Sequence, residues 1–411
     1  MCGIVACVGE KNTNEFLIDG LEKLEYRGYD SAGVALSATA GHQLYKCQGK
    51  VAKLRQLTAG LPSKKSAGIG HTRWATHGEP SQKNAHPHVS SSGRFALVHN
   101  GIIENYRELK AELEAKKVPF KSDTDTEVLV ALVEQIALED KLDAYEALRR
   151  ALLAVSGAYA VALIDTAEPD QLIVARKGSP LVIGLGQNGA VYAASDATPL
   201  VSYAKEVIYL EENEVARLRS GLAPEIETIA DASPTKPHAV RLELEEQAIQ
   251  KSGYDHFMLK EIFEQPNALR DSLRGRVLPR EGIIKLGGIE EYEQHIAKSN
   301  RIIIIACGTS WHAALVAEYY FEQLAQIPVE VEYASEFRYR DPIIKEGDVV
   351  IAISQSGETA DTLAALDLAK SRGAIILGIC NVAGSSIARM TDAGIYTHAG
   401  PEISVASTKA F

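Results

Sequence analysis

The sequence predicts an α+β part followed by an α/β part that is built on a doubly wound parallel sheet. Up to about residue 230, short apolar runs bounded by Gly, Asn, Asp and Ser indicate strands, and helical periodicities lie between them. After residue 299, fully apolar runs alternate with helical segments, which is typical of a parallel sheet covered on both faces. With 411 residues, the chain is expected to form two or three domains rather than one very large core.

The first part is expected to contain much antiparallel pairing. Its predicted strands are residues 4–8, 33–36, 95–98, 158–164, 172–175 and 191–194. Its predicted helices are residues 13–24, 106–115, 126–137 and 145–155, where apolar residues recur at spacings of three and four. Residues 184–189 have the glycine spacing of a dinucleotide-binding turn, but a strand follows where a helix is needed. This segment therefore indicates a hairpin turn.

The boundary between the two parts is predicted where the composition shifts to Asp, Ser, Pro, Thr and Lys, around residues 226–239. We therefore assign residues 1–240 to the first domain, 241–298 to a connector with amphipathic helices, and 299–411 to the second domain. Within the connector, residues 254–273 predict one or two helices. The predicted strands of the second domain are residues 301–306, 329–333, 348–353 and 374–380. Residues 407–411 look like the opening of a helix, so this domain is expected to be cut short at its C-terminal side.

Composition and charge exclude several function classes. The formal net charge of -11, without a long Lys/Arg run, argues against nucleic-acid binding. No apolar run approaches the roughly 18 residues of a membrane span, and no basic-then-apolar leader is present, so a cytoplasmic location is expected. The five cysteines are scattered without a Cys-x-x-Cys pair, which indicates neither a disulfide framework nor a zinc site.

Cys2 is followed by Gly3, and a small residue here favours removal of the initiator methionine. The cysteine would then carry both a thiol and a free α-amine. Because an α-amino group titrates near ~7.7 to 8.0, it can take the thiol proton at neutral pH. N-terminal threonine enzymes use the same arrangement. The alternative is that Cys2 is only a small apolar residue that begins a strand.

Four polar clusters at predicted strand ends extend this pattern: residues 27–33, 71–77, 99–105 and 122–127. Together with the opening Met-Cys-Gly-Ile-Val, they resemble the class II glutamine amidotransferases. More narrowly, the whole chain resembles the isomerising glutamine:fructose-6-phosphate aminotransferases, the glucosamine-6-phosphate synthases. The resemblance implies an Ntn-hydrolase-type sandwich for the first domain and no cofactor or metal.

The resemblance also implies individual roles. Cys2 would attack the carboxamide of glutamine, and the Asn100 side chain with the Gly101 N–H would form the oxyanion hole, where one lost donor typically costs about 10²- to 10³-fold in rate. Arg73 would hold the α-carboxylate of glutamine and Asp125 its α-ammonium. The remaining implied glutamine-binding residues are Trp74, Thr76 and His77.

Each of these residues also has a structural interpretation. Asn100-Gly101 is a strong hairpin-turn signal, and Arg73 could form a surface ion pair. Asp123 and Asp125 could cap the following helix. Trp74 could be loop packing rather than part of a loop that closes over glutamine. The clustered histidines invite a metal site, but their spacings fit no common zinc arrangement; they are His71, His77, His86, His88 and His99.

Two strand-to-helix turns of the second domain are rich in Ser, Thr and Gly: residues 307–310 and 354–359. Helix N-termini offer free N–H groups and partial positive charge, so such turns can bind phosphate without lysine. The alternative is helix capping and ordinary turn chemistry. The second turn resembles the SIS (sugar isomerase) fold, which implies a sugar-phosphate site formed by Thr309, Ser310, Ser354, Gln355, Ser356 and Thr359, with Val405 and Ser407 beside it.

The expected function is therefore glutamine hydrolysis with ammonia transfer to D-fructose 6-phosphate, giving D-glucosamine 6-phosphate and L-glutamate. Family members continue into a second SIS domain and a C-terminal tail that carry the isomerising residues. The chain is thus expected to be truncated before that domain and to retain only glutaminase activity and sugar-phosphate binding. A homodimer is expected. The alternatives are a non-catalytic sugar-phosphate-binding or regulatory partner, and another class II amidotransferase.

Overall fold

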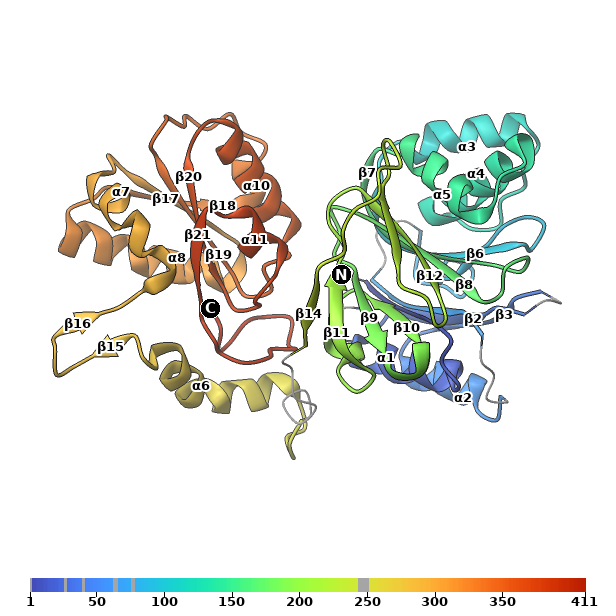
Figure 1. The fold of residues 1–411 in the computed structure, drawn as a ribbon, viewed down its shortest axis with the longest axis horizontal. Helices are drawn as coiled ribbons and strands as arrows, with labels where there is room; N and C mark the ends of the chain where they lie inside the picture. Colours follow the sequence, from blue (N-terminus) through green and yellow to red (C-terminus); the bar gives the residue numbers. More distant parts are fainter. Residues whose placement is uncertain (1, 26–27, 39–40, 62–65, 75–77, 243–250) are drawn as a thin grey trace. The chain divides into compact units, whose positions relative to one another are not determined.

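The computed structural model describes residues 1–411 except 1, 26–27, 39–40, 62–65, 75–77 and 243–250. The chain divides into two compact units, residues 1–246 and 247–411 (Figure 1). None of the helices in the described part has the length and hydropathy of a membrane span.

The first unit contains two antiparallel sheets among its described residues. The larger has eight strands, in the order β14 (Ala239–Arg241), β11 (Ala204–Tyr209), β9 (Val182–Gly186), β10 (Val191–Ala194), β1 (Gly3–Val8), β4 (Gly68–Arg73), β2 (Ser31–Leu36) and β3 (Gln43–Gln48). The other has six, in the order β13 (Glu225–Thr228), β12 (Glu214–Arg219), β8 (Gln171–Lys177), β7 (Gly157–Asp165), β6 (Phe95–Ile103) and β5 (His88–Val89).

The two sheets pack face to face, and helices cover their outer faces, so the unit has four layers (Figure 1). Helices α1 (Thr13–Lys23) and α2 (Val51–Thr58) cover the eight-stranded sheet. Helices α3 (Tyr106–Ala115), α4 (Asp125–Asp140) and α5 (Ala144–Leu153) cover the six-stranded sheet. This arrangement confirms the predicted sandwich. Each predicted strand and helix of the first part is found.

Strand β1 lies inside the eight-stranded sheet, between β10 and β4. Side chains alternate across a strand. Ile4 and Ala6 therefore belong to the core between the sheets, whereas Val5 and Cys7 pack on the α1 side. Both faces are buried, which explains an uninterrupted apolar run in an antiparallel sheet. This strand fixes Cys2, the residue before it.

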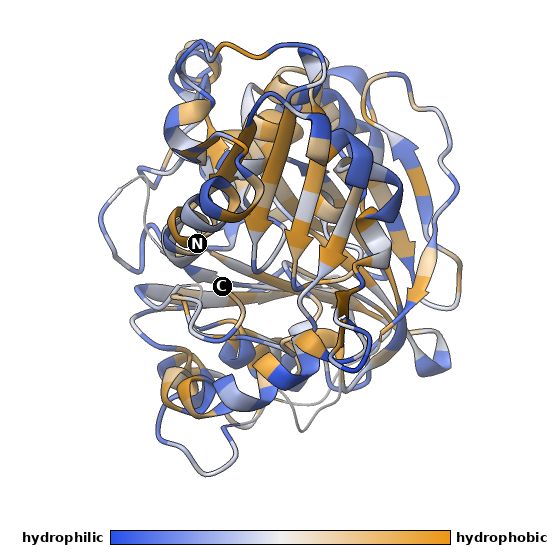
Figure 2. Ribbon diagram, turned by 90° about the vertical axis from the view of Figure 1, so that its left-hand side faces the viewer, coloured by the Kyte–Doolittle hydropathy of each residue, from blue (hydrophilic) through white to orange (hydrophobic). Residues whose placement is uncertain are grey.

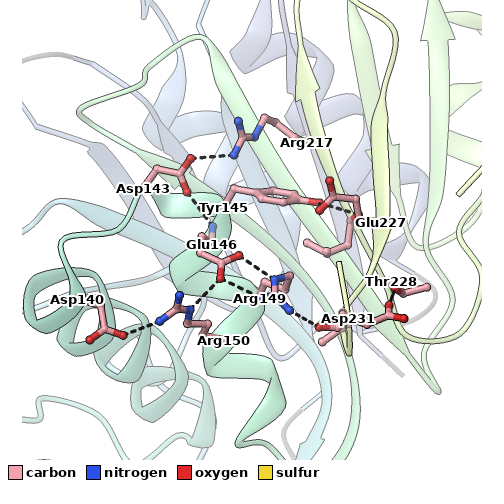
Figure 3. Close-up of polar contacts among 12 residues, drawn as sticks. Asp140, Asp143, Tyr145, Glu146, Arg149, Arg150, Arg217, Glu227, Thr228 and Asp231 are labelled. Carbon is pink, nitrogen blue, oxygen red and sulfur yellow. Dashed lines mark hydrogen bonds and ion pairs between the residues drawn. The ribbon is translucent and has the colours of Figure 1, made fainter. Parts of the chain in front are cut away.

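A polar network ties α5 to the neighbouring sheet (Figure 3). Arg217 on β12 donates to Asp143, the N-cap residue of α5, at 2.8 Å. On α5, Glu146 accepts from Arg149 and Arg150, each at 2.8 Å. These hydrogen bonds, that from Arg149 first, lower the pKa of the Glu146 carboxyl to about 2. Glu146 therefore stays ionised down to low pH and keeps both arginines paired along α5.

The second unit begins with α6 (Phe257–Leu273), a single helix that passes through Pro266. A hairpin of β15 (Val277–Leu278) and β16 (Ile283–Ile284) and then the short helices η5 (Gly287–Tyr292) and α7 (Glu293–Lys298) follow. The rest alternates strands and helices: β17 (Ile302–Ala306), α8 (Gly308–Tyr320), η6 (Phe321–Ala325), β18 (Val329–Tyr333), α9 (Ala334–Phe337), β19 (Val349–Ser354), α10 (Ala360–Ser371), β20 (Ile375–Cys380), α11 (Ser386–Met390) and β21 (Ala393–Tyr396).

The five strands β17 to β21 form one fully parallel sheet in the order β18-β17-β19-β20-β21. The predicted parallel sheet is confirmed. Figure 2 shows the hydrophobic residues concentrated along strands and the hydrophilic residues in connecting turns. The order in which strands are added reverses between β17 and β19, because β18 lies on one side of β17 and β19 lies on the other. In open α/β sheets, ligands bind outside the carboxyl ends of the strands at such a point.

The last residues depart from the prediction, because 407–411 do not open a helix. Their backbone N–H groups are engaged by carboxylates instead. Glu402 accepts from the N–H groups of Thr408 and Lys409 at 2.7 and 2.9 Å. On α6, Glu261 accepts from Ile403 N–H at 2.6 Å. This terminal loop is therefore held against α6.

Candidate active site

A pocket in the first unit brings together residues that are far apart in the sequence. It is lined by Cys2, Arg73, Trp74, His86, His99, Gly101, Thr124, Asp125 and Thr126. Five of these were predicted from the sequence as glutaminase residues. The antiparallel register of β1 and β4 pairs Gly3 with Thr72, which puts Cys2 beside Arg73. The facing sheet and the start of α4 supply the other side of the pocket.

The Cys2 thiol lies at the entrance of β1 and is only partly buried. Its Sγ accepts a hydrogen bond from the Trp74 N–H at 3.3 Å. Burial raises the pKa of this thiol, while that hydrogen bond and the Arg73 charge partly oppose the rise. The thiol is therefore protonated at neutral pH and needs a base before it can attack. Cys2 thus lines the pocket directly before strand β1, and its role as the nucleophile stays a prediction.

Asn100 and Gly101 lie inside strand β6, paired with Ala160 and Tyr159 of β7. The hairpin-turn interpretation is therefore wrong, because the strand continues through both residues to Ile103. The Asn100 side chain donates to the Cys2 carbonyl oxygen at 3.1 Å. Gly101 has a φ of 125°. A Cβ here would lie 2.0 Å from the Ala158 carbonyl oxygen, so the backbone at this position requires glycine.

The pocket also carries two opposite charges. Arg73 is only 4% exposed, so the interpretation as a surface ion pair is wrong. Its guanidinium donates to the carbonyl oxygen of Gly78 at 3.2 Å. The Asp125 carboxylate is buried and accepts from the Ile103 N–H at 3.0 Å. A buried cation and a buried anion on one pocket suit a zwitterionic amino acid.

The capping interpretation of the aspartates is also wrong. Thr124 is the N-cap residue of α4, and its hydroxyl accepts from the Glu127 N–H at 3.3 Å. Asp125 is already the first helical residue, which frees its carboxylate for the pocket. Asp123 is instead paired with Lys83 at 3.1 Å.

The predicted contacts around Trp74 are only partly visible. The Trp74 ring is 49% exposed and packs edge-on against Tyr29, with 5.3 Å between ring centroids. It lines the pocket while remaining open to solvent. Thr76 and His77 lie outside the described residues. Closure of this segment over glutamine therefore stays a prediction.

The second unit juxtaposes the two predicted phosphate-binding turns. Strands β17 and β19 are adjacent and in register, with Ala306 paired to Ile353. Both turns therefore leave the carboxyl edge of the sheet where the strand order reverses. Thr309 and Ser310 lie in the first turn of α8. The N-cap residues of α8 and α10 are Cys307 and Thr359. Neither makes a side-chain capping hydrogen bond, so helix capping does not account for the residue types at these two positions.

Hydroxyl groups organise the turn after β19. The Ser354 hydroxyl accepts from the Gly357 N–H at 3.0 Å and lies 3.4 Å from the Thr359 hydroxyl. The Ser356 hydroxyl accepts from the Glu358 N–H at 3.2 Å. Gly357 has a φ of 65°, and a Cβ there would lie 2.0 Å from the Ser385 hydroxyl oxygen. The turn is thus tight, with its hydroxyls partly used in its own structure.

Known protein families match both units. The glutamine amidotransferase domain family matches residues 56–255, and the SIS domain family matches residues 295–411. Proteins named glutamine--fructose-6-phosphate aminotransferase [isomerizing] from Bacteroides thetaiotaomicron and Chlorobaculum tepidum are 53% and 52% identical to this chain. Each comparison covers 100% of this chain and 67% of the relative.

The chain belongs to the glutamine--fructose-6-phosphate aminotransferase family. It spans about two thirds of the length of these relatives. A solved glutamine phosphoribosylpyrophosphate amidotransferase from B. subtilis has a TM-score of 0.50 at 18% identity, covering 92% of this chain and 81% of that one. At this identity the likeness concerns the fold alone.

In this aminotransferase family member, the sequence reasoning missed several pocket residues. His86, His99, Thr124 and Thr126 line the pocket but were not predicted as site residues. The two threonines lie in the polar cluster 122–127, and His99 directly precedes Asn100. Predicted site residues next to them in the sequence could therefore have indicated all three. Ser195 was also missed. Its hydroxyl accepts from the Asn100 amide at 2.8 Å, and only its place directly after an apolar strand could have suggested it.

The histidines of this aminotransferase form a buried cluster rather than a surface site. His71 stacks on His86 with ring centroids 4.1 Å apart, and His88 lies edge-on to His86 at 5.0 Å. Burial lowers the pKa of His71 to about 3 and those of His86 and His88 well below the usual value. Within the described residues, which leave out His77, no three His, Cys, Asp or Glu side chains are placed to hold a metal ion.

Val405 and Ser407 of the predicted sugar-phosphate set lie in the terminal loop. Val405 is 82% exposed, and the Ser407 hydroxyl donates to Glu402 at 2.6 Å. The loop starts near the second turn, because Asn381 bonds both the Gln355 and the Gly400 carbonyl oxygens, at 3.3 and 2.7 Å. In the described part of the chain, no hydrogen bond joins Ser407 to that turn. Their sugar-phosphate role stays a prediction.

Proposed function

We propose that this chain carries the glutamine-hydrolysing site and one sugar-phosphate site of the aminotransferase. Glutamine is hydrolysed to glutamate and ammonia, and the ammonia is transferred to D-fructose 6-phosphate, giving D-glucosamine 6-phosphate. The observation that carries the proposal is the pocket in which Cys2, Arg73, Asp125 and Gly101 converge. The proposal is limited to the two sites that residues of this chain form.

The thiol of Cys2 is the proposed nucleophile. After removal of the preceding methionine, the α-amine of Cys2 accepts the thiol proton, and Sγ attacks the carboxamide carbon of glutamine. The tetrahedral intermediate collapses as the C–N bond breaks and ammonia leaves with a proton from the α-ammonium. Water then hydrolyses the γ-glutamyl thioester to glutamate.

Four further residues act on charge. Asn100 and Gly101 lie on β6 beside Cys2. The Asn100 side-chain amide and the Gly101 backbone N–H therefore stabilise the oxyanion. Arg73 binds the α-carboxylate of glutamine and Asp125 binds its α-ammonium. Both charges are buried, so their interactions with a substrate are weakly screened by solvent. A simple amide lacks both charges, and the pocket therefore selects glutamine.

The turns after β17 and β19 form the proposed phosphate site. The first N–H groups of a helix have no partner within the helix, so the starts of α8 and α10 offer donors without a positive side chain. Hydroxyl groups in the two turns add further donors; they belong to Thr309, Ser310, Ser354, Ser356 and Thr359. The location at the strand-order reversal supports ligand binding. Gln355, between Ser354 and Ser356, completes the set. A homodimeric state and a cytoplasmic location stay predictions from the sequence.

The deciding experiment measures glutamate release from glutamine by the wild type and by Cys2→Ala. Intact mass spectrometry first establishes that the initiator methionine is gone. We expect activity in the wild type and none in the variant. Calorimetry then measures fructose 6-phosphate binding, which Cys2→Ala should leave unchanged. Glutamate release that persists in Cys2→Ala, after exclusion of a contaminating glutaminase, contradicts the proposed nucleophile.

A further inference from the structure

The orientation of the Asn100 side-chain amide decides whether an N–H or a carbonyl oxygen faces Cys2. Only the first arrangement can stabilise an oxyanion. Three groups contact this amide from different elements. His71 on β4 lies 2.9 Å from Oδ1, and Ser195 and the Cys2 carbonyl lie 2.8 and 3.1 Å from Nδ2.

The His99 carbonyl oxygen determines which ring nitrogen of His71 carries hydrogen. This oxygen lies 3.1 Å from Nε2 of His71. Because a carbonyl oxygen accepts and cannot donate, Nε2 must be the protonated nitrogen. The other nitrogen, Nδ1, is buried and has no hydrogen-bond partner in the described part of the chain, which fits a neutral ring. Burial also keeps the pKa of His71 low, at about 3.

A protonated Nε2 then requires an acceptor on Asn100, which is Oδ1. The opposite end of the amide is fixed as well. The Ser195 hydroxyl accepts from Asn100 Nδ2 and also from the Ile4 N–H at 2.7 Å. A flipped amide would direct its oxygen at the Cys2 carbonyl and its N–H groups at the Nε2–H. The Ser195 hydroxyl can accept or donate, but the Cys2 carbonyl oxygen can only accept and the protonated Nε2 can only donate, so these two contacts favour the same orientation.

We propose that His71 is a positioning residue of the glutaminase reaction, which holds the Asn100 amide with its N–H toward Cys2. This inference rests on the proposed function. His71 does not line the pocket and need not touch glutamine. It acts through Asn100, with its ring held by stacking on His86. Since a neutral ring is maintained, the orientation does not change across the physiological pH range.

The test compares His71→Leu with His71→Gln in the full chain. Leucine removes the donor, so kcat for glutamate release should fall by ~10²-fold, the typical effect of a catalytic group misplaced by about 1 Å. KM should change little, because the oxyanion exists only in the transition state. Glutamine can present a side-chain N–H near the position of Nε2, so His71→Gln should recover most of kcat. No recovery would overturn the proposal.

Two controls separate positioning from damage. His42→Leu removes a histidine whose ring contacts the Arg94 carbonyl oxygen at 2.8 Å and whose side chain does not line the pocket. Its kcat should stay within about threefold of the wild type, as expected for a site outside the reaction. Alkylation of Cys2 by iodoacetamide forms an S–C bond and releases iodide without an oxyanion. The alkylation rate, measured by mass spectrometry of the peptide that contains Cys2, should be unchanged in His71→Leu.

The outcomes distinguish this inference from the proposed function. If Cys2→Ala abolishes glutamate release while His71→Leu retains full kcat, the glutaminase assignment stands and the positioning role is wrong. A parallel loss of alkylation and kcat in His71→Leu also overturns it, because the pocket itself has then collapsed. If Cys2→Ala remains active, the proposed function fails irrespective of His71.

Discussion

Replacing Gly101 by alanine tests the oxyanion hole through the backbone. The added Cβ would lie 2.0 Å from the Ala158 carbonyl oxygen, whereas real Cβ contacts are not found under 3.0 Å, so β6 and β7 must separate by about 1 Å. The φ of 125° disfavours alanine by about 1–3 kcal/mol, and overpacking adds about 1–3 kcal/mol. We expect a stability loss of about 2–6 kcal/mol and, from the donor displacement, a ~10²-fold loss in kcat.

The matched control is Gly93→Ala. Gly93 also has a positive φ, 82°, but a Cβ there would meet no atom within 4 Å. Gly93→Ala therefore measures the stability cost of a positive φ without the cost of steric overlap. Urea denaturation followed by circular dichroism, together with glutamate release, measures both effects. Equal midpoints for Gly101→Ala and Gly93→Ala, with wild-type kcat in both, would refute the reasoning.

Three further predictions concern other sites. Asp125→Asn should raise KM for glutamine by about 10- to 10²-fold, as expected for a lost charge-assisted contact; an unchanged KM contradicts the ammonium-binding role. Because the folded-state pKa of Glu146 is depressed to about 2, its ion pair with Arg149 stabilises the fold above the unfolded pKa and is lost as pH falls. The melting-temperature gap between wild type and Glu146→Gln should thus close between about pH 4.5 and 2; a constant gap argues against this ion pair. Ser354→Ala should weaken fructose 6-phosphate binding in calorimetry by about tenfold, while Ser371→Ala, at the exposed end of α10, should not; equal effects argue against the phosphate site.

The sequence predicted the class of both units and much of the pocket, for identifiable reasons. Strand β1 was predictable because both of its faces are buried and its residues are uniformly apolar. Gly101 on β6 and Asp125 on α4 were predicted through the family resemblance, whereas the pocket residues His99 and Thr126 on the same elements were not. Local propensity alone favoured a hairpin at Asn100-Gly101, but pairing along β7 overrides it.

Strand β4 was not predicted, although it carries His71 and Arg73. Its Gly68 and Gly70 suggest a turn in the sequence. In the structure they make room for α1, since a Cβ on Gly68 would lie 2.9 Å from a Leu17 methyl carbon, and one on Gly70 would lie 3.1 Å from a methyl carbon of Leu21. These glycines reflect the close approach of a helix that packs from elsewhere in the chain. Such tertiary reasons are not present in the local sequence.

The position of β1 in its sheet has a consequence for synthesis of the protein on the ribosome. Its neighbours are β4, about 65 residues later, and β10, about 190 residues later. Because it emerges before both neighbours, the strand that positions Cys2 must wait for most of the first unit before it gains its second neighbour. Non-local pairing of this kind slows folding. The thiol is therefore organised late, and an incomplete nascent chain holds no assembled glutaminase that could release ammonia.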